Sequence, residues 1–426
     1  MSEERFEVIV IGGGLAGLSA AYRLSKAGKK VLVLEKGQSS GAKNVSGGRI
    51  YTYALDRLMG SEWKDAPLER EINQEWLMMM NEEDAMIINT TTNALGGQSY
   101  SVLRARFDKW LAEQVEKAGG LVISGANVDG LLRKDGVVCG VKVGEEELEC
   151  DLVIDAEGAN ALVAEREGII APVRAENFAV AAKYVIRLSE KTINERFMCN
   201  SGKGVALLGD GAANKGLFGG LFMYTNKDTV SIGLVQDMAT WKENGKSLPD
   251  AMEDLKSHPI IGKYIDGGEV VEYTAHIIPE GGYGAFSEFC GDGILITGDA
   301  AGLCLNRGFT VRGMDYAIMS GIAAADTAKQ ALDRGIFTKD FLKMYEARLE
   351  HNVLTDFKTL NKAHSYLANT EHMYTTYPNV AISAMQNLYR VDGGALKKAV
   401  KTIIGGVHDI NILSVAKDAL KGARSL

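Results

Sequence analysis

The sequence predicts an α/β fold: a Rossmann-type nucleotide-binding domain, an inserted antiparallel β-sheet domain and a helical C-terminal region. Short, continuous, β-branched runs predict buried parallel strands; they occur at residues 6–11, 31–35, 151–155 and 294–297. Strand patterns of a different kind lie between the last two runs, with a hairpin pattern at 223–230. The chain after residue 337 has a mostly helical and more polar pattern.

The elements follow in order from the N-terminus. The strand at 6–11 leads through a glycine-rich turn into a helix at 15–27, which Gly28 caps before the strand at 31–35. Residues 51–80 have a mixed helical pattern, with Met78, Met79 and Met80 in sequence. A helix is expected at 106–118, short strands at 122–143, antiparallel strands at 178–188, 216–224 and 230–235, and a long alanine-rich helix at 313–332.

Because strands of the first type return after the antiparallel block, we expect the nucleotide-binding domain to be discontinuous. The expected divisions are 1–175 plus 285–335 for that domain, 176–284 for the β-sheet domain that receives a substrate or quinone, and 336–426 for the helical region. The length of 426 residues suits two or three domains of ~100–200 residues each.

Composition and charge exclude several classes of protein. Hydrophobic residues make up 46% and charged residues 24%, so the chain is not mostly disordered. The net charge of −8, without a Lys/Arg-rich run, argues against nucleic acid as a partner. The five cysteines are scattered, so neither a zinc site nor a cysteine-ligated cluster is expected, and no metal site is predicted. The acidic N-terminus is not a signal peptide, and we expect a cytoplasmic protein with room for peripheral contact with the membrane.

The first motif with a chemical meaning is Gly12-x-Gly14-x-x-Gly17, followed by Glu35 at the end of the next strand. Gly12 permits the tight turn, Gly14 lets a pyrophosphate approach the backbone, and Gly17 lets helix and strand pack closely. The free N–H groups of the helix N-terminus favour an anion. Glu35 is placed to bind a ribose 2′-hydroxyl, which favours FAD or NAD over NADP.

Two further motifs follow buried strands. Asp155-Ala156-Glu157-Gly158 is compatible with an ordinary strand-to-helix turn as well as with a ligand site. Gly298-Asp299-Ala300 precedes the long helix, where an Asp can bind a sugar-alcohol hydroxyl and helix amides can face developing negative charge.

Together these motifs resemble the three FAD signatures of the hydroxylase-type flavoprotein superfamily, with Glu157 in place of the usual Asp. Four other segments, at 41–49, 103–108, 273–282 and 308–315, resemble the FixC-type members of the electron-transfer flavoprotein–quinone oxidoreductase family. The resemblance covers nearly the whole chain. Geranylgeranyl reductases are more distant relatives.

The resemblance implies an FAD-dependent oxidoreductase with FAD in an extended conformation. Adenosine is expected at Glu35, pyrophosphate at residues 12–17 and isoalloxazine near residues 298–313. The expected cofactor-binding residues are Gly12, Gly14, Leu15, Ala16, Gly17, Glu35, Lys36, Ser46, Gly47, Gly48, Arg104, Val128, Glu157, Gly158, Gly298, Asp299, Gly308 and Gly313. Arg104 is expected on a loop before the helix at 106–118, and a solvated role for it is equally compatible with the sequence.

The resemblance also implies partners. Electrons would arrive from a reduced electron-transfer flavoprotein and leave toward a quinone. The larger quinone oxidoreductases carry a ferredoxin-like iron–sulfur domain, but no cysteine follows Cys304 here. A separate ferredoxin-like iron–sulfur subunit is therefore expected to complete the electron path.

Several residues have a functional and a purely structural interpretation. His276 could move protons for a reduced flavin or quinone and is our candidate catalytic residue, although a strand histidine with a backbone partner explains it as well. Glu280 is a similar case. Residues 78–80 and 218–222 could line a channel for a quinone tail, or could simply be core.

The sequence is also compatible with two other functions. One is a flavin-dependent reductase or hydroxylase of a prenyl or other apolar small molecule, which would use its own reductant. The other is an FAD-bound scaffold subunit without turnover. Reduction of the flavin by NADH alone would favour the first, and complex formation without turnover would mark the second.

Overall fold

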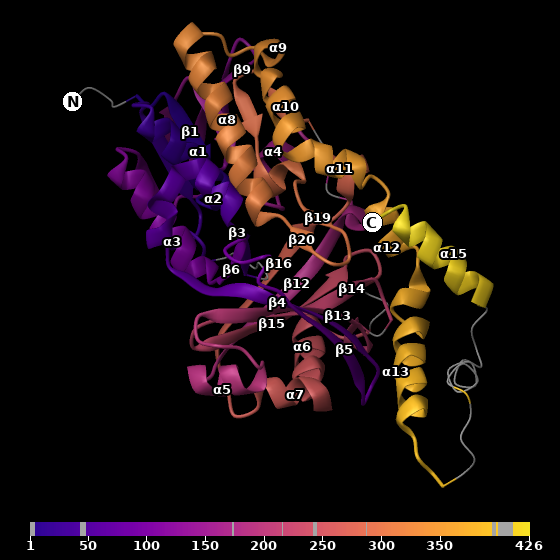
Figure 1. Ribbon diagram of the computed structural model, residues 1–426. Helices are drawn as coiled ribbons and strands as arrows, with labels where there is room; N and C mark the ends of the chain where they lie inside the picture. The colour runs from indigo at the N-terminus through magenta and orange to yellow at the C-terminus, as the bar shows by residue number, and fades with distance from the viewer. Residues whose placement is uncertain are drawn as a thin grey trace.

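The computed structural model contains two large β-sheets, and helices pack against each of them (Figure 1). It describes residues 5–42, 48–172, 174–214, 216–241, 245–286, 288–393, 398 and 412–426. One sheet has six strands and the other nine, and a small three-stranded sheet accompanies the first. Each large sheet has its own hydrophobic core.

The six-stranded sheet contains the four buried runs that the sequence predicts and two further strands, β7 and β17, in the order β17-β18-β11-β1-β2-β7. Its strands are β1 (Val8–Ile11), β2 (Val31–Glu35), β7 (Leu121–Ser124), β11 (Leu152–Asp155), β17 (Cys290–Gly291) and β18 (Ile294–Ile296). All pairs are parallel except β17 with β18. In register, Val10 lies between Val33 and Ile154, so the centre of the sheet is apolar.

Helices cover this sheet. Helix α1 (Leu15–Lys26) packs directly against α8 (Met314–Arg334), although almost three hundred residues separate them in the sequence. The contact is close because Gly321 has no side chain: a Cβ there would lie 2.3 Å from the Ala16 carbonyl oxygen. Helix α2 (Thr52–Met59) contacts α8 and helix α3 (Arg104–Lys117) contacts α1, whereas the short helix α4 (Leu162–Arg166) follows β11. The three-stranded sheet comprises β8 (Gly130–Lys134), β9 (Val137–Val143) and β10 (Glu146–Glu149).

The nine-stranded sheet is antiparallel apart from one parallel pair, β13 with β4. Its strands are β3 (Arg49–Tyr51), β4 (Leu68–Met80), β5 (Ala85–Thr91), β6 (Ser99–Val102), β12 (Phe178–Arg187), β13 (Lys203–Gly211), β14 (Gly219–Thr225), β15 (Thr229–Asp237) and β16 (Glu269–Pro279). The expected hairpin is present as β14 and β15. Helices α5 (Glu190–Arg196), α6 (Leu248–Ser257) and α7 (Pro259–Ile265) pack on one face.

The segment at 51–80 differs from its prediction. Only its first part is helical, whereas residues 68–80 form the long strand β4. Along β4 the side chains alternate, and Ile72, Trp76 and Met80 point into the protein. The strands at 49–102 pair within the nine-stranded sheet, although the segment is expected in the nucleotide-binding domain. The chain thus enters the second sheet earlier than position 176.

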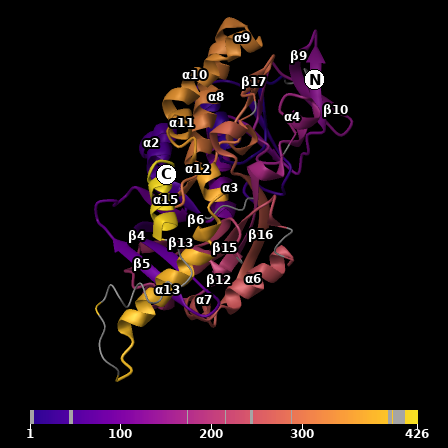
Figure 2. The same ribbon diagram turned by 90° about the vertical axis from the view of Figure 1, so that its right-hand side faces the viewer.

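The C-terminal region is helical, as the sequence predicts, and descends along both sheets (Figures 1 and 2). It contains α9 (Lys339–Leu342), α10 (Met344–Leu349), a π-helical turn (Glu350–Leu354), α11 (Thr355–Thr359), α12 (Ala363–Ala368), α13 (Thr376–Tyr389) and α15 (Ile412–Ala423). Helix α13 lies against β4 and β5. Among the described helices, none has the length and hydrophobicity that crossing a bilayer requires.

Candidate cofactor and electron-transfer site

The turn between β1 and α1 forms one end of the site. Gly12 has a φ of +102°, and a Cβ there would lie 2.3 Å from the Ala156 carbonyl oxygen, so only glycine fits. Gly14 is the N-cap of α1 and makes no side-chain capping bond. The first N–H groups of α1 therefore face the cavity that Gly12, Gly14 and Leu15 line, where they favour an anion.

Two of the predicted glycines act by packing rather than by lining the cavity. A Cβ on Gly17 would lie 2.1 Å from the Gly12 carbonyl oxygen, and one on Gly298 would lie 2.7 Å from the Ala16 Cβ. Neither residue is part of the cavity wall. They hold α1 against the strands, which keeps its N-terminus in place.

Glu35 is held at the end of β2 by backbone donors. Its carboxylate accepts hydrogen bonds from the N–H groups of Gly13, at 2.8 Å, and Gly37. These bonds fix the orientation of a carboxylate that also lines the cavity, beside Lys36. A carboxylate held in this way can accept the hydrogen bond of a sugar hydroxyl.

A single cavity of about 600 Å³ joins this turn to the nine-stranded sheet. The predicted residues that line it are Gly12, Gly14, Leu15, Ala16, Glu35, Lys36, Gly48, Arg104, Val128, Glu157, Gly158, His276, Asp299, Gly308 and Gly313. Ser46 and Gly47 were also predicted, but they lie outside the described residues. The structure thus brings together segments that the sequence spaces over three hundred residues.

The Asp155–Glu157 motif is held by hydrogen bonds within the protein. The Asp155 carboxylate accepts the Glu157 N–H at 3.0 Å, and Glu157 accepts the Val163 N–H at 2.8 Å, near the start of α4. Burial raises the pKa of both carboxyls. Glu157 therefore orders this turn while it lines the cavity, and it does not reach across the cavity as a free acid.

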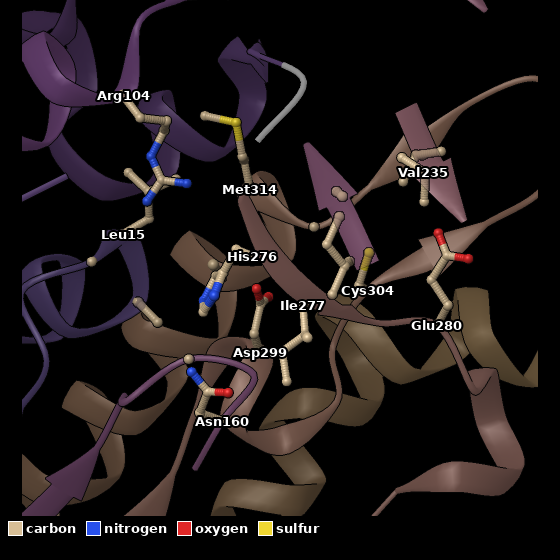
Figure 3. A pocket seen from close by; sticks show the side chains of 18 of the residues that line it. Leu15, Arg104, Asn160, Val235, His276, Ile277, Glu280, Asp299, Cys304 and Met314 are labelled. Carbon is tan, nitrogen blue, oxygen red and sulfur yellow. The ribbon is translucent and has the colours of Figure 1, made fainter. Parts of the chain in front are cut away.

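Arg104 is placed differently from its prediction. It is the first residue of α3 rather than part of a preceding loop, and its side chain is mostly buried. The guanidinium binds the buried Asp108 carboxylate through two hydrogen bonds of 2.7 and 2.6 Å. Figure 3 shows Arg104 on the same side of the cavity as Leu15 and His276. The ion pair keeps a positive charge at the cavity wall.

His276 and Asp299 lie in the middle of the cavity (Figure 3). Burial and the nearby Arg104 lower the pKa of His276, so its imidazole is neutral at pH 7. Burial raises the pKa of Asp299, and Arg104 opposes that shift. Asp299 stands in a 3-10 turn (Gly298–Ala301) that follows β18, close to the start of α8.

The far end of the cavity is more apolar. Residues 218–222, on and before β14, line it together with Leu208, Val235 and Leu367. Met78 and Met80 do not line it: they are fully buried in the core of the nine-stranded sheet. Residues 218–222 therefore line the cavity as a channel for a quinone tail would require, whereas residues 78–80 do not.

Several lining residues have no sequence motif that would have identified them. Asp210, Asn160, Arg166, Cys304, Asn306 and Tyr374 are examples. They come from separate strands, turns and helices, so only the assembled fold brings them to the cavity. Glu280, weighed with His276 in the sequence, also lines it.

The residues fit FAD by their own geometry. The turn at Gly12 leaves no space for a Cβ, the N-terminus of α1 has no side-chain cap among the described residues, and Glu35 is held by two backbone donors. The cavity runs from there to the turn that carries Asp299 and to the start of α8. This length and order of groups suit an extended dinucleotide, with pyrophosphate at α1 and the flavin ring near Asp299.

Comparison with known families gives two matches along the chain. The model of the FAD dependent oxidoreductase family matches residues 7–91, and that of the ETF-QO/FixC family C-terminal domain matches residues 363–426. Curated relatives match over the full length. Protein FixC of Salmonella typhi is 43% identical to this chain over 429 residues. The probable electron transfer flavoprotein-quinone oxidoreductase YdiS of Escherichia coli (strain K12) is 39% identical over 430 residues. Both matches cover the whole of both chains.

Solved structures share the fold at low identity. A geranylgeranyl bacteriochlorophyll reductase-like protein from Thermoplasma acidophilum superimposes with a TM-score of 0.71 at 18% identity, covering 97% of this chain and 99% of its own. The halogenase PltM, in complex with phloroglucinol and FAD, superimposes with a TM-score of 0.65 at 15% identity, covering 89% and 80%. The predicted Rossmann-type fold and the predicted cofactor, FAD, are confirmed.

Proposed function

Because this chain belongs to the electron-transfer flavoprotein–quinone oxidoreductase/FixC family, we propose that it accepts electrons from a reduced electron-transfer flavoprotein and passes them to a quinone. The chain is an FAD-dependent oxidoreductase of electron transfer. The proposal adds the identity of the donor and of the acceptor.

One observation carries the proposal. The cavity that suits FAD continues, without a break, to an apolar wall formed by residues 218–222, Val235 and Leu367. An apolar space beside the flavin position suits a ring with a hydrocarbon tail, such as a quinone.

In the proposed arrangement, the chain's residues bind and orient the cofactor. The N-terminus of α1 binds the pyrophosphate, Glu35 accepts a ribose hydroxyl, and Asp299 binds the sugar-alcohol chain. FAD, when bound, supplies the ability to take two electrons and release them singly. The neutral His276 can accept and hold a proton beside the ring, which is its proposed catalytic role.

The electron path requires partners. The five cysteines of this sequence are scattered, and those within the structure are all free thiols, so we place any iron–sulfur cluster on a separate ferredoxin-like subunit. Quinones with long apolar tails reside in membranes, so the proposal includes peripheral contact of this protein with the inner face of the membrane.

The test is anaerobic reduction of the purified flavoprotein, followed by the visible flavin absorbance. NADH alone should leave the flavin band unchanged, whereas reduced electron-transfer flavoprotein should bleach it. A short-chain quinone should then restore the band. The assay needs only the holoprotein and at least an equimolar amount of the reduced donor, because each flavin takes up two electrons.

Three outcomes would contradict the proposal. Fast bleaching by NADH alone would indicate a self-sufficient reductase or hydroxylase of an apolar small molecule. A band that bleaches with the reduced donor but does not return with quinone would exclude quinone as the acceptor. A preparation that binds FAD but exchanges electrons with neither partner would point to a scaffold subunit.

A further inference from the structure

A buried carboxyl lies at the apolar end of the cavity. Glu280 directly follows β16, its residue is only 5% exposed, and it lines the cavity together with Val235 and Cys304 (Figure 3). Its backbone N–H donates to the Asn177 carbonyl oxygen at 2.8 Å, which fixes the position of the residue. Nothing assigned to FAD binding uses this carboxyl.

Burial and one neighbouring carboxylate shape the electrostatics of Glu280. Burial raises the pKa of its carboxyl to about 7, Asp237 at the end of β15 adds to the rise, and a hydrogen bond with Asn306 opposes it. The other titratable groups that face it are Cys304 before β19, His364 on α12 and Tyr374 after the 3-10 turn at 371–373. Among the described residues no cation forms an ion pair with it.

The charge state follows from these neighbours. Burial holds the Cys304 thiol and the Tyr374 hydroxyl in their protonated forms by raising the pKa of each, and it lowers the pKa of His364, which is neutral at pH 7. A second carboxyl of this end, Asp210, has a pKa raised by burial to about 7. The groups at the apolar end of the cavity whose protons exchange near pH 7 are therefore the two carboxyls, Asp210 and Glu280.

We propose that Glu280 is a catalytic residue that donates a proton to the quinone during its reduction. The inference rests on the proposed function, since it takes a quinone as the acceptor. Its geometric basis is that Glu280 is a buried carboxyl in the wall of the apolar end of the cavity, where the quinone ring would lie beside the flavin position near Asp299.

The reaction balances with one proton from the protein. Anionic two-electron-reduced FAD, the quinone and one added proton give oxidised FAD and the quinol. Two electrons and one proton leave the reduced cofactor, both quinone carbonyls become hydroxyls, and the second proton comes from the Glu280 carboxyl. Solvent protons then restore the carboxylic acid before the next turnover.

The pKa of the carboxyl sets the pH dependence. Below pH 7 the acid form predominates and can donate, whereas above pH 7 the carboxylate predominates and cannot. A pKa near the working pH is the value expected for an efficient general acid. Quinone reduction should therefore slow as the pH rises through about 7.

The experiment is single-turnover reoxidation of the photoreduced holoprotein, mixed anaerobically either with a short-chain quinone or with ferricyanide. Ferricyanide takes electrons without protons, so it reports electron transfer alone. Glu280→Gln keeps the size of the side chain but has no acid, and Glu280→Asp keeps the acid. Glu269→Gln, at the start of the strand β16 that Glu280 follows but with a side chain 70% exposed, is the matched control.

Glu280→Gln should slow reoxidation by quinone by roughly 10²-fold below pH 7 and abolish the pH dependence, while reoxidation by ferricyanide is unchanged. Glu280→Asp should restore part of the rate and the pH dependence, and Glu269→Gln should behave as the unaltered protein. A quinone rate in Glu280→Gln equal to that of the unaltered protein, or an equal loss with ferricyanide, would overturn the proposal.

A second readout does not depend on turnover. Infrared spectra of the oxidised holoprotein should contain protonated-carboxyl C=O absorbance that titrates near pH 7, with contributions from Glu280 and Asp210, and Glu280→Gln should lose the Glu280 contribution. Absorbance of the same intensity and titration in both proteins would assign the proton to another carboxyl and contradict the inference. Failure of the unaltered protein to react with quinone while it reacts with ferricyanide would instead refute the proposed acceptor.

Discussion

Replacing Gly12 by alanine tests whether the first turn is shaped for the cofactor. The substitution adds a Cβ at 2.3 Å from the Ala156 carbonyl oxygen and places a non-glycine residue at a φ of +102°. Backbone strain of this kind costs about 1–2 kcal/mol. Overpacking against a backbone group that cannot rotate away adds about 1–3 kcal/mol. The expected loss of unfolding free energy is therefore ~2–5 kcal/mol.

The same change should weaken FAD binding, because relief of the clash moves the turn that aims the first N–H groups of α1. A lost hydrogen bond to a charged group is worth about 1.5–3 kcal/mol, which corresponds to roughly 10- to 100-fold in affinity. Urea unfolding of the FAD-free protein measures the first effect. Titration of FAD, followed by the quenching of its fluorescence, measures the second.

Gly28→Ala is the matched control. Gly28 has a φ of +77°, but nothing lies within 4 Å of a Cβ built there, so only the backbone strain of about 1–2 kcal/mol remains. If the two variants lose the same unfolding free energy and Gly12→Ala binds FAD as tightly as the unaltered protein, the close contact between Gly12 and Ala156 does not matter and the reasoning is refuted.

Three further predictions concern buried charges. Arg104→Met should lower the unfolding free energy by about 3–5 kcal/mol because it removes the cation bound to the buried Asp108. The double variant with Asp108→Leu should recover most of this loss. Urea unfolding measures both variants, and no recovery in the double variant would contradict the ion-pair explanation. Arg70→Met should cost about 3 kcal/mol or more, because the buried guanidinium binds the Asn226 and Lys203 carbonyl oxygens, but it should leave FAD affinity unchanged, since Arg70 is outside the cavity wall. Burial raises the pKa of Asp210 to about 7, so its ionisation lowers the unfolding free energy progressively as the pH rises from about 4 to about 7. The unfolding free energy of Asp210→Asn should therefore exceed that of the unaltered protein by ~2–4 kcal/mol at pH 8 and equal it at pH 4. A difference that does not depend on pH in denaturant unfolding would refute this.

The parts of the fold that the sequence predicts are those with local signals. The turn at Gly12, the helix after it and Glu35 follow one another within a single strand–helix–strand unit, and each has a residue type that its position requires. The hairpin of β14 and β15 is likewise local. These elements need little information from the rest of the chain.

The strand β4 shows where local signals mislead. Its alternation of buried side chains, at Ile72, Trp76 and Met80, has the period of a strand, but Glu, Leu and Met are strong helix formers and obscure it. Pairing with β5 and β13 decides the conformation. A strand that is fixed by partners far away in the sequence is difficult to predict from its own residues.

The apolar end of the cavity is the least predictable part of the site. Asp210 and Glu280 come from the ends of β13 and β16, which are separated by two other strands and two helices in the sequence. Asp210 belongs to no recognisable motif, and Glu280 is marked only by the resemblance of the segment at 273–282. Their chemistry depends on burial, which raises the pKa of each carboxyl to about 7, and burial is a property of the assembled protein.

The order of strands in the six-stranded sheet has a consequence for biosynthesis. β1 and β2 are made first, but β18 and α8, which complete the sheet and bring Asp299 to the cavity, are made almost three hundred residues later. At about 5–20 residues per second, a ribosome needs roughly a quarter of a minute to a minute for that stretch. β11 is made about halfway through this stretch, and from then on its apolar edge is unpaired until β18 follows. The complete FAD site therefore forms only after α8 has been made.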